Sequence, residues 1–117
     1  MPKEALKRFK FRTKFKLDEE DRSYIEKRDL AQIRLHAFDF IRRRLAPAEP
    51  KNDGKQTPFQ GHPVFKAQHA TATCCRGCLE KWHRIKKGRT LSSPEMQRVV
   101  SVIMEWIEGQ LKKGGTK

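Results

Sequence analysis

No stretch of this chain approaches the roughly 18 consecutive apolar residues that a membrane-spanning helix needs. Only 36% of its 117 residues are hydrophobic, whereas 35% are charged. The first ten residues, MPKEALKRFK, lack the apolar segment of a secretory signal. We therefore expect a cytoplasmic protein with no membrane partner. The low apolar share predicts one small domain with a thin core that a few helices share.

Cysteine is scarce as well, since the chain holds only three. An odd number of thiols in a reducing compartment does not make a disulfide framework. An iron–sulfur cluster usually needs four thiolates, and the βαβ pattern around a thioredoxin-like motif is missing. The thiols are therefore free, metal-bound or catalytic.

Acidic residues are outnumbered: 14 Asp and Glu stand against 27 Lys and Arg, which leaves a net charge of +13. The positive charge is clustered in residues 1–17, 42–44 and 81–89. Such clusters attract polyanions by counterion release, and nucleic acid is the commonest partner, although a basic chain can also lack a dedicated one. We expect nucleic acid or another polyanion to be bound with weak sequence preference. The candidate residues are Lys10, Arg12, Lys14, Lys16, Lys81, Arg84, Lys86, Lys87 and Arg89.

Residues 1–17 predict an extended basic arm. From Phe9 to Leu17, apolar side chains alternate with Lys and Arg, which is the pattern of a strand with one apolar face. The chain shows no obvious partner strand. We expect the arm to lie across helices or to pair with a second copy.

The rest of the chain predicts a mainly α fold of three to four helices, with a long central loop. Residues 18–46 are expected to be helical, with an N-cap at Asp18, a second start at Asp29 and apolar residues at helical spacing. The remaining segments are expected to form a loop at 47–63, a cysteine and histidine segment with a helix at 64–89, a helix at 90–112 and a frayed tail at 113–117. Ser92 and Glu95 match a capping box.

The loop at 47–63 lacks periodicity and is rich in proline and glycine. A structureless loop of this length in a small domain is usually functional or disordered. It leads directly into the cysteine segment, which favours a function. We expect Lys55, Gln56 and Thr57 to hold a ligand, with little part in stability.

The stretch QHATATCCRGCLEKWH, residues 68–83, contains all three cysteines and two histidines. Its Cys-x-x-Cys pair brings two thiolates within reach of one ion. Zinc takes four soft or borderline ligands, which thiolates and imidazoles provide. A strictly straight helix would not bring Cys75, Cys78 and His83 together. The predicted zinc ligands are His69, Cys75, Cys78 and His83, with Cys74 and His62 as substitutes.

Two other interpretations of this stretch remain open. In the first, the protein is an enzyme in which a cysteine is activated by His69 or His83, with its substrate held by the 55–57 loop. In the second, the protein is an interaction module without metal. Cys75 and Cys78 then share a helix face with apolar residues and are buried as small hydrophobes.

Four motifs, NDGKQTP, GHPVF, AQHATATCCRGCLEKWH and KGR followed by a helix, together resemble the bacterial and phage family called domain of unknown function 4186. The resemblance covers about residues 9–111. It implies that the loop and the cysteine segment act as one unit, and it brings no established activity with it. After His83 the family pattern is closer to Gly-Ile-Pro-Lys-Gly, whereas this chain has RIKKG, which adds positive charge beside the site.

Overall fold

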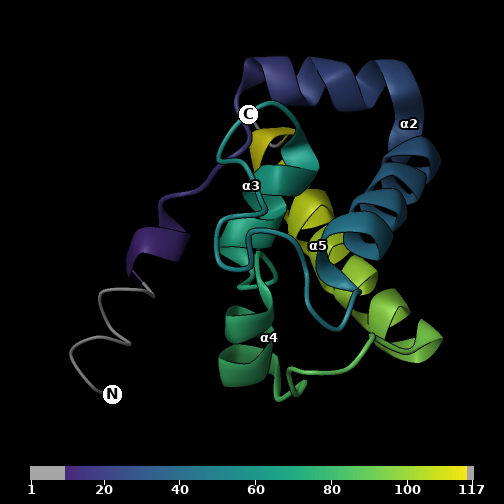
Figure 1. The fold of residues 1–117 in the computed structure, drawn as a ribbon. Coiled ribbons are helices and arrows are strands. Elements are labelled where there is room, and N and C mark those ends of the chain that lie inside the picture. The colour runs from purple at the N-terminus through teal and green to yellow at the C-terminus, as the bar shows by residue number, and fades with distance from the viewer. Residues whose placement is uncertain (1–9, 116–117) are drawn as a thin grey trace.

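A computed structural model describes the backbone of residues 10–115 and the side chains of residues 10–112. These residues form helices and loops and contain no strand, so the prediction of a small, mainly α domain is confirmed. The elements are α2 (Glu19–Phe40), η1 (Ile41–Leu45), α3 (Pro63–Ala70), α4 (Arg76–His83) and α5 (Ser93–Gly115). Figure 1 shows α3 and α4 stacked beside α5, with α2 bent around the far side.

The bend in α2 lies where the sequence predicts a second helix start. Asp18 caps the first part, because its Oδ1 accepts from the Asp21 amide at 2.8 Å while Asp21 Oδ2 accepts from the Asp18 amide at 3.0 Å. Asp29 interrupts the helix with φ 65° and ψ 163°. Its Oδ1 accepts from the Gln32 amide at 3.0 Å, which starts the second part.

The second part of α2 passes into η1, one turn of π-helix. The Ala46 amide donates to the Ile41 carbonyl at 2.8 Å, which widens the last turn just before Pro47. Ile41 and Leu45 remain fully buried on the inner face of this turn. The helix therefore ends with several carbonyl groups pointing beyond its last turn.

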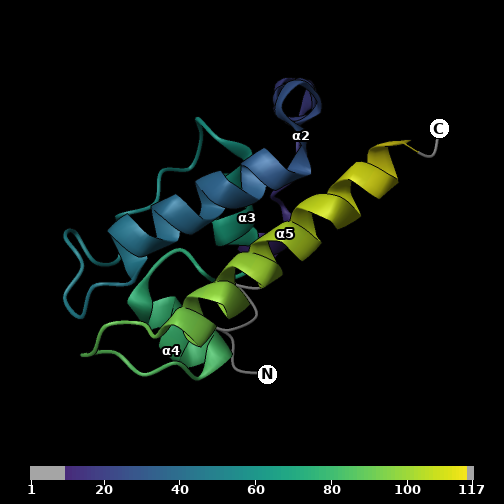
Figure 2. The same ribbon diagram turned by 90° about the vertical axis from the view of Figure 1, so that its right-hand side faces the viewer.

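The core lies between α2, η1, α3 and α5 (Figure 2). The apolar residues predicted at helical spacing within residues 18–46 do face the core. Ile33, Ala37, Ile41 and Leu45 are all 0% exposed. The matching face of α5 is buried as well, at Val99, Val100, Ile103 and Ile107. Burying such side chains contributes about 1.5–3 kcal/mol each, so this seam dominates the stability of the fold.

The capping box at the start of α5 is present. The Ser92 amide donates to Glu95 Oε1 at 2.9 Å, and the Glu95 amide donates to Ser92 Oγ at 3.2 Å. At its other end α5 continues to Gly115, beyond the predicted helix end at residue 112.

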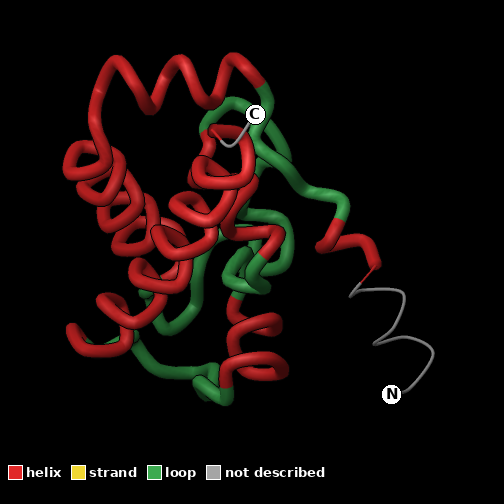
Figure 3. Tube along the Cα trace, turned by 180° about the vertical axis from the view of Figure 1, so that it is seen from behind, coloured by secondary structure: helices red, strands yellow, loops and turns green. Residues whose placement is uncertain are grey.

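The predicted strand in the N-terminal arm is wrong for the described residues, because residues 10–13 form a helical turn. A single strand would leave its backbone groups unpaired, and the described residues offer no partner strand. The turn instead brings Phe11 and Phe15 edge to face, with ring centroids 5.2 Å apart. Figure 3 shows this turn on the side of α3 opposite to α2. Residues 1–9 of the predicted arm lie outside the described residues.

Candidate metal centre

Three cysteine sulfurs gather at the N-terminus of α4. Cys75 is the N-cap of the helix, and its Sγ accepts from the Cys78 amide at 3.4 Å. The Sγ atoms of Cys74, Cys75 and Cys78 all lie within 4.8 Å of one another, and the Cys74 and Cys78 sulfurs are 3.6 Å apart. All three residues are free thiols and are part-buried. This grouping can present three soft ligands to one metal ion.

Arg12 reaches this cluster from the N-terminal turn. Its Nη2 donates to Cys78 Sγ at 3.1 Å, and its Nη1 donates to the His69 carbonyl and lies 4.0 Å from Cys74 Sγ. Hydrogen bonds from the Cys74 and Cys75 sulfurs, together with the Arg12 cation, hold the pKa of Cys78 well below its usual range. The pKa of Cys74 is raised by its hydrogen bonds to the other two sulfurs and by burial. The corner therefore favours negative charge on sulfur at Cys78.

His69 packs beside the cluster, with its ring held at the Nε2 edge and stacked on aromatic rings. Its Nε2 lies 3.0 Å from the Thr57 carbonyl and 3.2 Å from the Pro58 carbonyl, so this nitrogen carries the proton and Nδ1 keeps the lone pair. The ring stacks on Phe59, with centroids 4.4 Å apart and planes at 14°. Burial lowers the pKa of His69, so its imidazole is in the neutral, ligating form at neutral pH.

The other two predicted histidines lie elsewhere. His83 Nε2 contacts the Thr71 carbonyl at 2.7 Å from the far end of α4. His62 caps α3, where its Nδ1 accepts from the Val64 amide at 3.0 Å, and its Nε2 faces His36 Nδ1 at 3.1 Å. His36 is part-buried by this contact. Among the described residues, the group within 4.8 Å contains the three cysteines and no histidine.

The predicted set of four is thus not assembled as a unit. Cys75 and Cys78 come together with Cys74, which the sequence offered only as a substitute. His83 is separated from Cys75 because α4 runs straight between them, as the helical geometry of this spacing requires. His69 is the histidine that the fold brings beside the cluster, through the Arg12 bridge from its carbonyl to Cys78.

The polar loop residues divide into two groups. Thr57 is only 6% exposed, and its Oγ1 donates to the Cys74 carbonyl at 2.8 Å. Contrary to the expectation from the sequence, we therefore predict that Thr57 contributes to stability, since its hydroxyl bonds to the cysteine segment. Gln56 closes a local turn by accepting from the Gly54 amide at 2.7 Å. Lys55 is exposed and lines a hollow of about 400 Å³ together with Arg43 and Arg44.

Sequence reasoning missed Arg76, the residue that follows Cys75 in the motif. Its side chain is 1% exposed and its guanidinium donates to five backbone carbonyls, at 2.8–3.3 Å. The acceptors are Leu45, Ala46, Pro47, Lys86 and Arg89. Arg76 thus joins the open end of η1 to the segment after α4. An arginine inside a Cys-x-x-Cys pair was the available signal.

The predicted polyanion-binding residues are exposed with one exception. Arg12 is only partly exposed and faces the sulfurs, which gives it partners other than a polyanion. Arg89 is exposed but pairs with Glu95 at 2.8 Å. The remaining seven are exposed: Lys10, Lys14, Lys16, Lys81, Arg84, Lys86 and Lys87.

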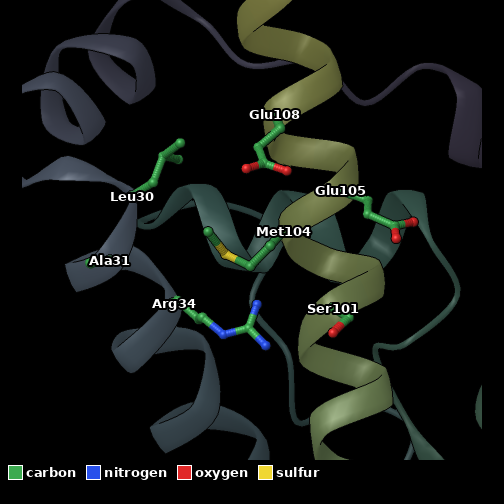
Figure 4. Close-up of a pocket in the computed structure, with 7 residues that line it drawn as sticks. All are labelled: Leu30, Ala31, Arg34, Ser101, Met104, Glu105 and Glu108. Atoms are coloured by element: carbon green, nitrogen blue, oxygen red, sulfur yellow. The ribbon is translucent and has the colours of Figure 1, made fainter.

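A further hollow of about 290 Å³ lies between α2 and α5 (Figure 4). Arg34 and Met104 face each other across it, and Glu105 and Glu108 line the α5 side. It has neither cysteine nor histidine in its wall, and its charges are of both signs. This hollow therefore offers neither a thiolate nor an imidazole, the ligands that zinc prefers.

A sequence model described as "Domain of unknown function (DUF4186)" matches residues 3–108. The chain belongs to this family. The DUF4186 match includes the N-terminal turn, the loop, the cysteine cluster and most of α5, so the resemblance seen in the motifs is confirmed. No solved structure matches the chain. In the part of the chain that the structure describes, every helix is too short or too polar to cross a membrane.

Proposed function

We propose that this DUF4186 protein binds one zinc ion through Cys74, Cys75 and Cys78, with His69 as the fourth ligand, and binds a polyanion through its basic surface. The observation that carries the metal part is the approach of three cysteine sulfurs to within 4.8 Å of one another. Zinc prefers thiolate and imidazole ligands in a set of four. The corner holds three thiols, and the His69 ring would have to move toward them to complete the set.

His69 suits the fourth position because of its hydrogen bonds. A zinc-binding histidine commonly donates its other ring N–H to a backbone carbonyl, which fixes the ring and its tautomer. His69 Nε2 has such acceptors in the carbonyls of Thr57 and Pro58, at 3.0 and 3.2 Å. The neutral ring then has Nδ1 available for a metal.

Arg12 supplies the charge that this ligand set requires. Three thiolates and one Zn²⁺ carry a net negative charge, and burying it without compensation is costly. The Arg12 guanidinium, 3.1 Å from Cys78 Sγ, offsets that charge and donates a hydrogen bond to a sulfur. Arg12 is thus a supporting residue of the proposed centre.

Elemental analysis combined with native mass spectrometry tests the metal. We expect about one zinc per chain, and three thiols that resist alkylation until a chelator removes the ion. Cys78→Ser and His69→Ala should lose zinc, whereas His83→Ala should keep it. The proposal would be contradicted by a metal-free protein whose melting temperature changes neither with chelator nor with added zinc.

The same alkylation experiment addresses the enzyme alternative. Among the described residues, the hydrogen bonds to cysteine sulfur come from Arg12, a backbone amide and other cysteines, and none comes from a histidine ring. A thiolate nucleophile predicts one cysteine that labels far faster than the other two. Joint protection of all three thiols is expected instead.

The polyanion part rests on the net charge of +13 and on the exposed lysines of the N-terminal turn and of the segment after α4. We expect binding of a short nucleic acid to weaken steeply with salt. The double variant Lys14→Gln with Lys16→Gln should make the negative slope of log K against log salt shallower by about 1.5. The matched control is Lys27→Gln with Lys112→Gln, which should leave the slope unchanged. Absence of binding at low salt would exclude this part.

A further inference from the structure

A pocket of about 440 Å³ lies beside the cysteine cluster. Its walls come from four places: the N-terminal turn, the residues between α3 and α4, the end of α4 and the outer part of α5. Four ring side chains line it, namely Phe15, Trp82, His83 and Trp106. Both tryptophans of the chain are therefore in this one wall.

The charge around this pocket is positive. None of its lining residues is acidic, and Arg12 is the charged residue among them. Two further guanidiniums lie against its rim, since Arg98 donates to the His83 carbonyl at 3.4 Å and Arg22 donates to the Gln110 carbonyl at 2.9 Å. The exposed Lys14 and Lys16 flank Phe15 in the chain. An anionic group attached to a flat ring would find cations at the rim.

Two hydrogen-bond donors in the wall are unsatisfied. Arg12 Nε and Trp82 Nε1 are buried and have no hydrogen-bond partner in the described part of the chain. A buried donor left without an acceptor is destabilising, so such groups call for an explanation. Both atoms are buried, so a ligand whose edge carries carbonyl or ring-nitrogen acceptors would reach them once the Arg12 and Trp82 side chains turn toward the pocket.

We propose that this pocket binds an unpaired nucleobase that carries a phosphate. Aromatic rings stack on bases of any sequence, a cationic rim holds the phosphate, and the base edge offers the acceptors. This inference rests on the polyanion part of the proposed function and deepens it. It favours single-stranded over double-stranded nucleic acid, because paired bases are not available for insertion.

Tryptophan fluorescence reports on this pocket directly, because both tryptophans line it. We expect a short single-stranded oligonucleotide to quench the fluorescence on binding. An abasic strand with the same number of phosphates should bind through its charge without quenching. A nucleoside monophosphate forms the third titration, and quenching by it alone would assign the pocket to a free nucleotide.

The variant Trp106→Leu should weaken binding of the base-bearing strand about tenfold or more and leave binding of the abasic strand unchanged. The matched control is Phe38→Leu, which removes a ring that packs on the core away from the pocket. The comparison of base-bearing and abasic strands on the unaltered protein needs no variant, so a folding defect in Trp106→Leu would not hide the result.

Three outcomes would count against the inference. Equal affinity for both strands without quenching, with no response to the monophosphate, removes the base pocket while the electrostatic part of the proposed function stands. Absence of binding by either strand, again with no response to the monophosphate, removes both. Duplex binding that quenches as strongly as single-strand binding would also count against an inserted base.

Discussion

The helical core and the cysteine corner of this molecule are held together in different ways. In the core, α2, η1 and α5 meet through side chains such as Ile33, Ile41 and Ile103, all 0% exposed. In the cysteine corner, which comprises residues 10–16, 53–59 and 68–83, single polar links join segments far apart in sequence. Arg12 contacts Cys78 across 66 residues, and Thr57 contacts Cys74 across 17.

This difference has a consequence for function. In a core, many apolar contacts each contribute a part of the stability. Substitutions that conserve the volume of a side chain are therefore tolerated there. A polar link in a part-buried corner has no substitute, because its loss leaves the partner group unsatisfied. The corner is therefore held in one geometry by few groups, as a metal centre requires. Its stability should be sensitive to single polar substitutions.

The largest effect is expected from Arg76→Met, which replaces a buried guanidinium by an apolar chain of similar length. Five backbone carbonyls lose the guanidinium donor, although the Ala46 carbonyl keeps the Leu91 amide at 2.9 Å. We expect the free energy of unfolding to fall by about 3 kcal/mol or more. That would equal the loss from a core truncation such as Ile103→Ala, about 2–5 kcal/mol. Urea denaturation measures both.

The control for this prediction is Arg89→Met. The Arg89 side chain is exposed and pairs with Glu95, so its loss should cost far less than the loss of Arg76. Equal small losses for both arginines would mean that the corner is not coupled to the core at all.

A pH-dependent effect is expected at His62, which caps α3 and packs against α2. Burial, followed by the nearby charges of His36 and Arg28, lowers the pKa of His62 from 6.5 to about 4. The unfolded chain takes up this proton below pH 6.5 and the folded chain only near pH 4. Stability should therefore fall as the pH drops from 6.5 to 4, by at most about 1.4 kcal/mol per pH unit, and His62 adds no further loss below pH 4.

The variant His62→Asn sharpens this prediction, because asparagine can still cap α3 but does not titrate. Its urea-derived stability should depend less on pH between 6.5 and 4.5 than that of the unaltered protein. Asp18 and Glu95 have pKa values lowered to about 2, so they contribute chiefly below this window. Parallel pH profiles for the two proteins would show that His62 is not held neutral by burial.

The smallest effect is expected from Thr57→Val, which keeps the shape of the side chain and removes its hydroxyl. The Cys74 carbonyl loses its donor, so we expect a loss of about 1–2 kcal/mol in urea denaturation. The cysteines should also react faster with an alkylating reagent in the metal-free protein. Thr90→Val, at an exposed position, should change neither quantity. Unchanged stability in Thr57→Val would return Thr57 to the role of a ligand-binding loop residue.

Sequence reasoning worked well wherever a structure depends on neighbouring residues. The caps at Asp18 and Ser92 and the break at Asp29 each follow from a side chain that bonds to a backbone amide three residues away. The predicted strand was wrong because a strand depends on residues far away in the sequence. Alternation describes one face of an extended chain, but a strand also needs a partner, and Phe11 and Phe15 have a shared contact with Phe59 instead.

By itself, the sequence determined the mainly α class, the apolar seam, the basic surface and the presence of three thiols within five residues. These depend on composition, on periodicity and on bonds between residues a few positions apart. Only the tertiary structure decided that Cys74 joins the cluster, that His69 and not His83 lies beside it, and that Arg12 faces sulfur. It also turned Arg76 inward and gathered both tryptophans around one pocket. Such pairings depend on which loops and helix ends the packing of the core brings together. The spacing of residues along the sequence does not determine this.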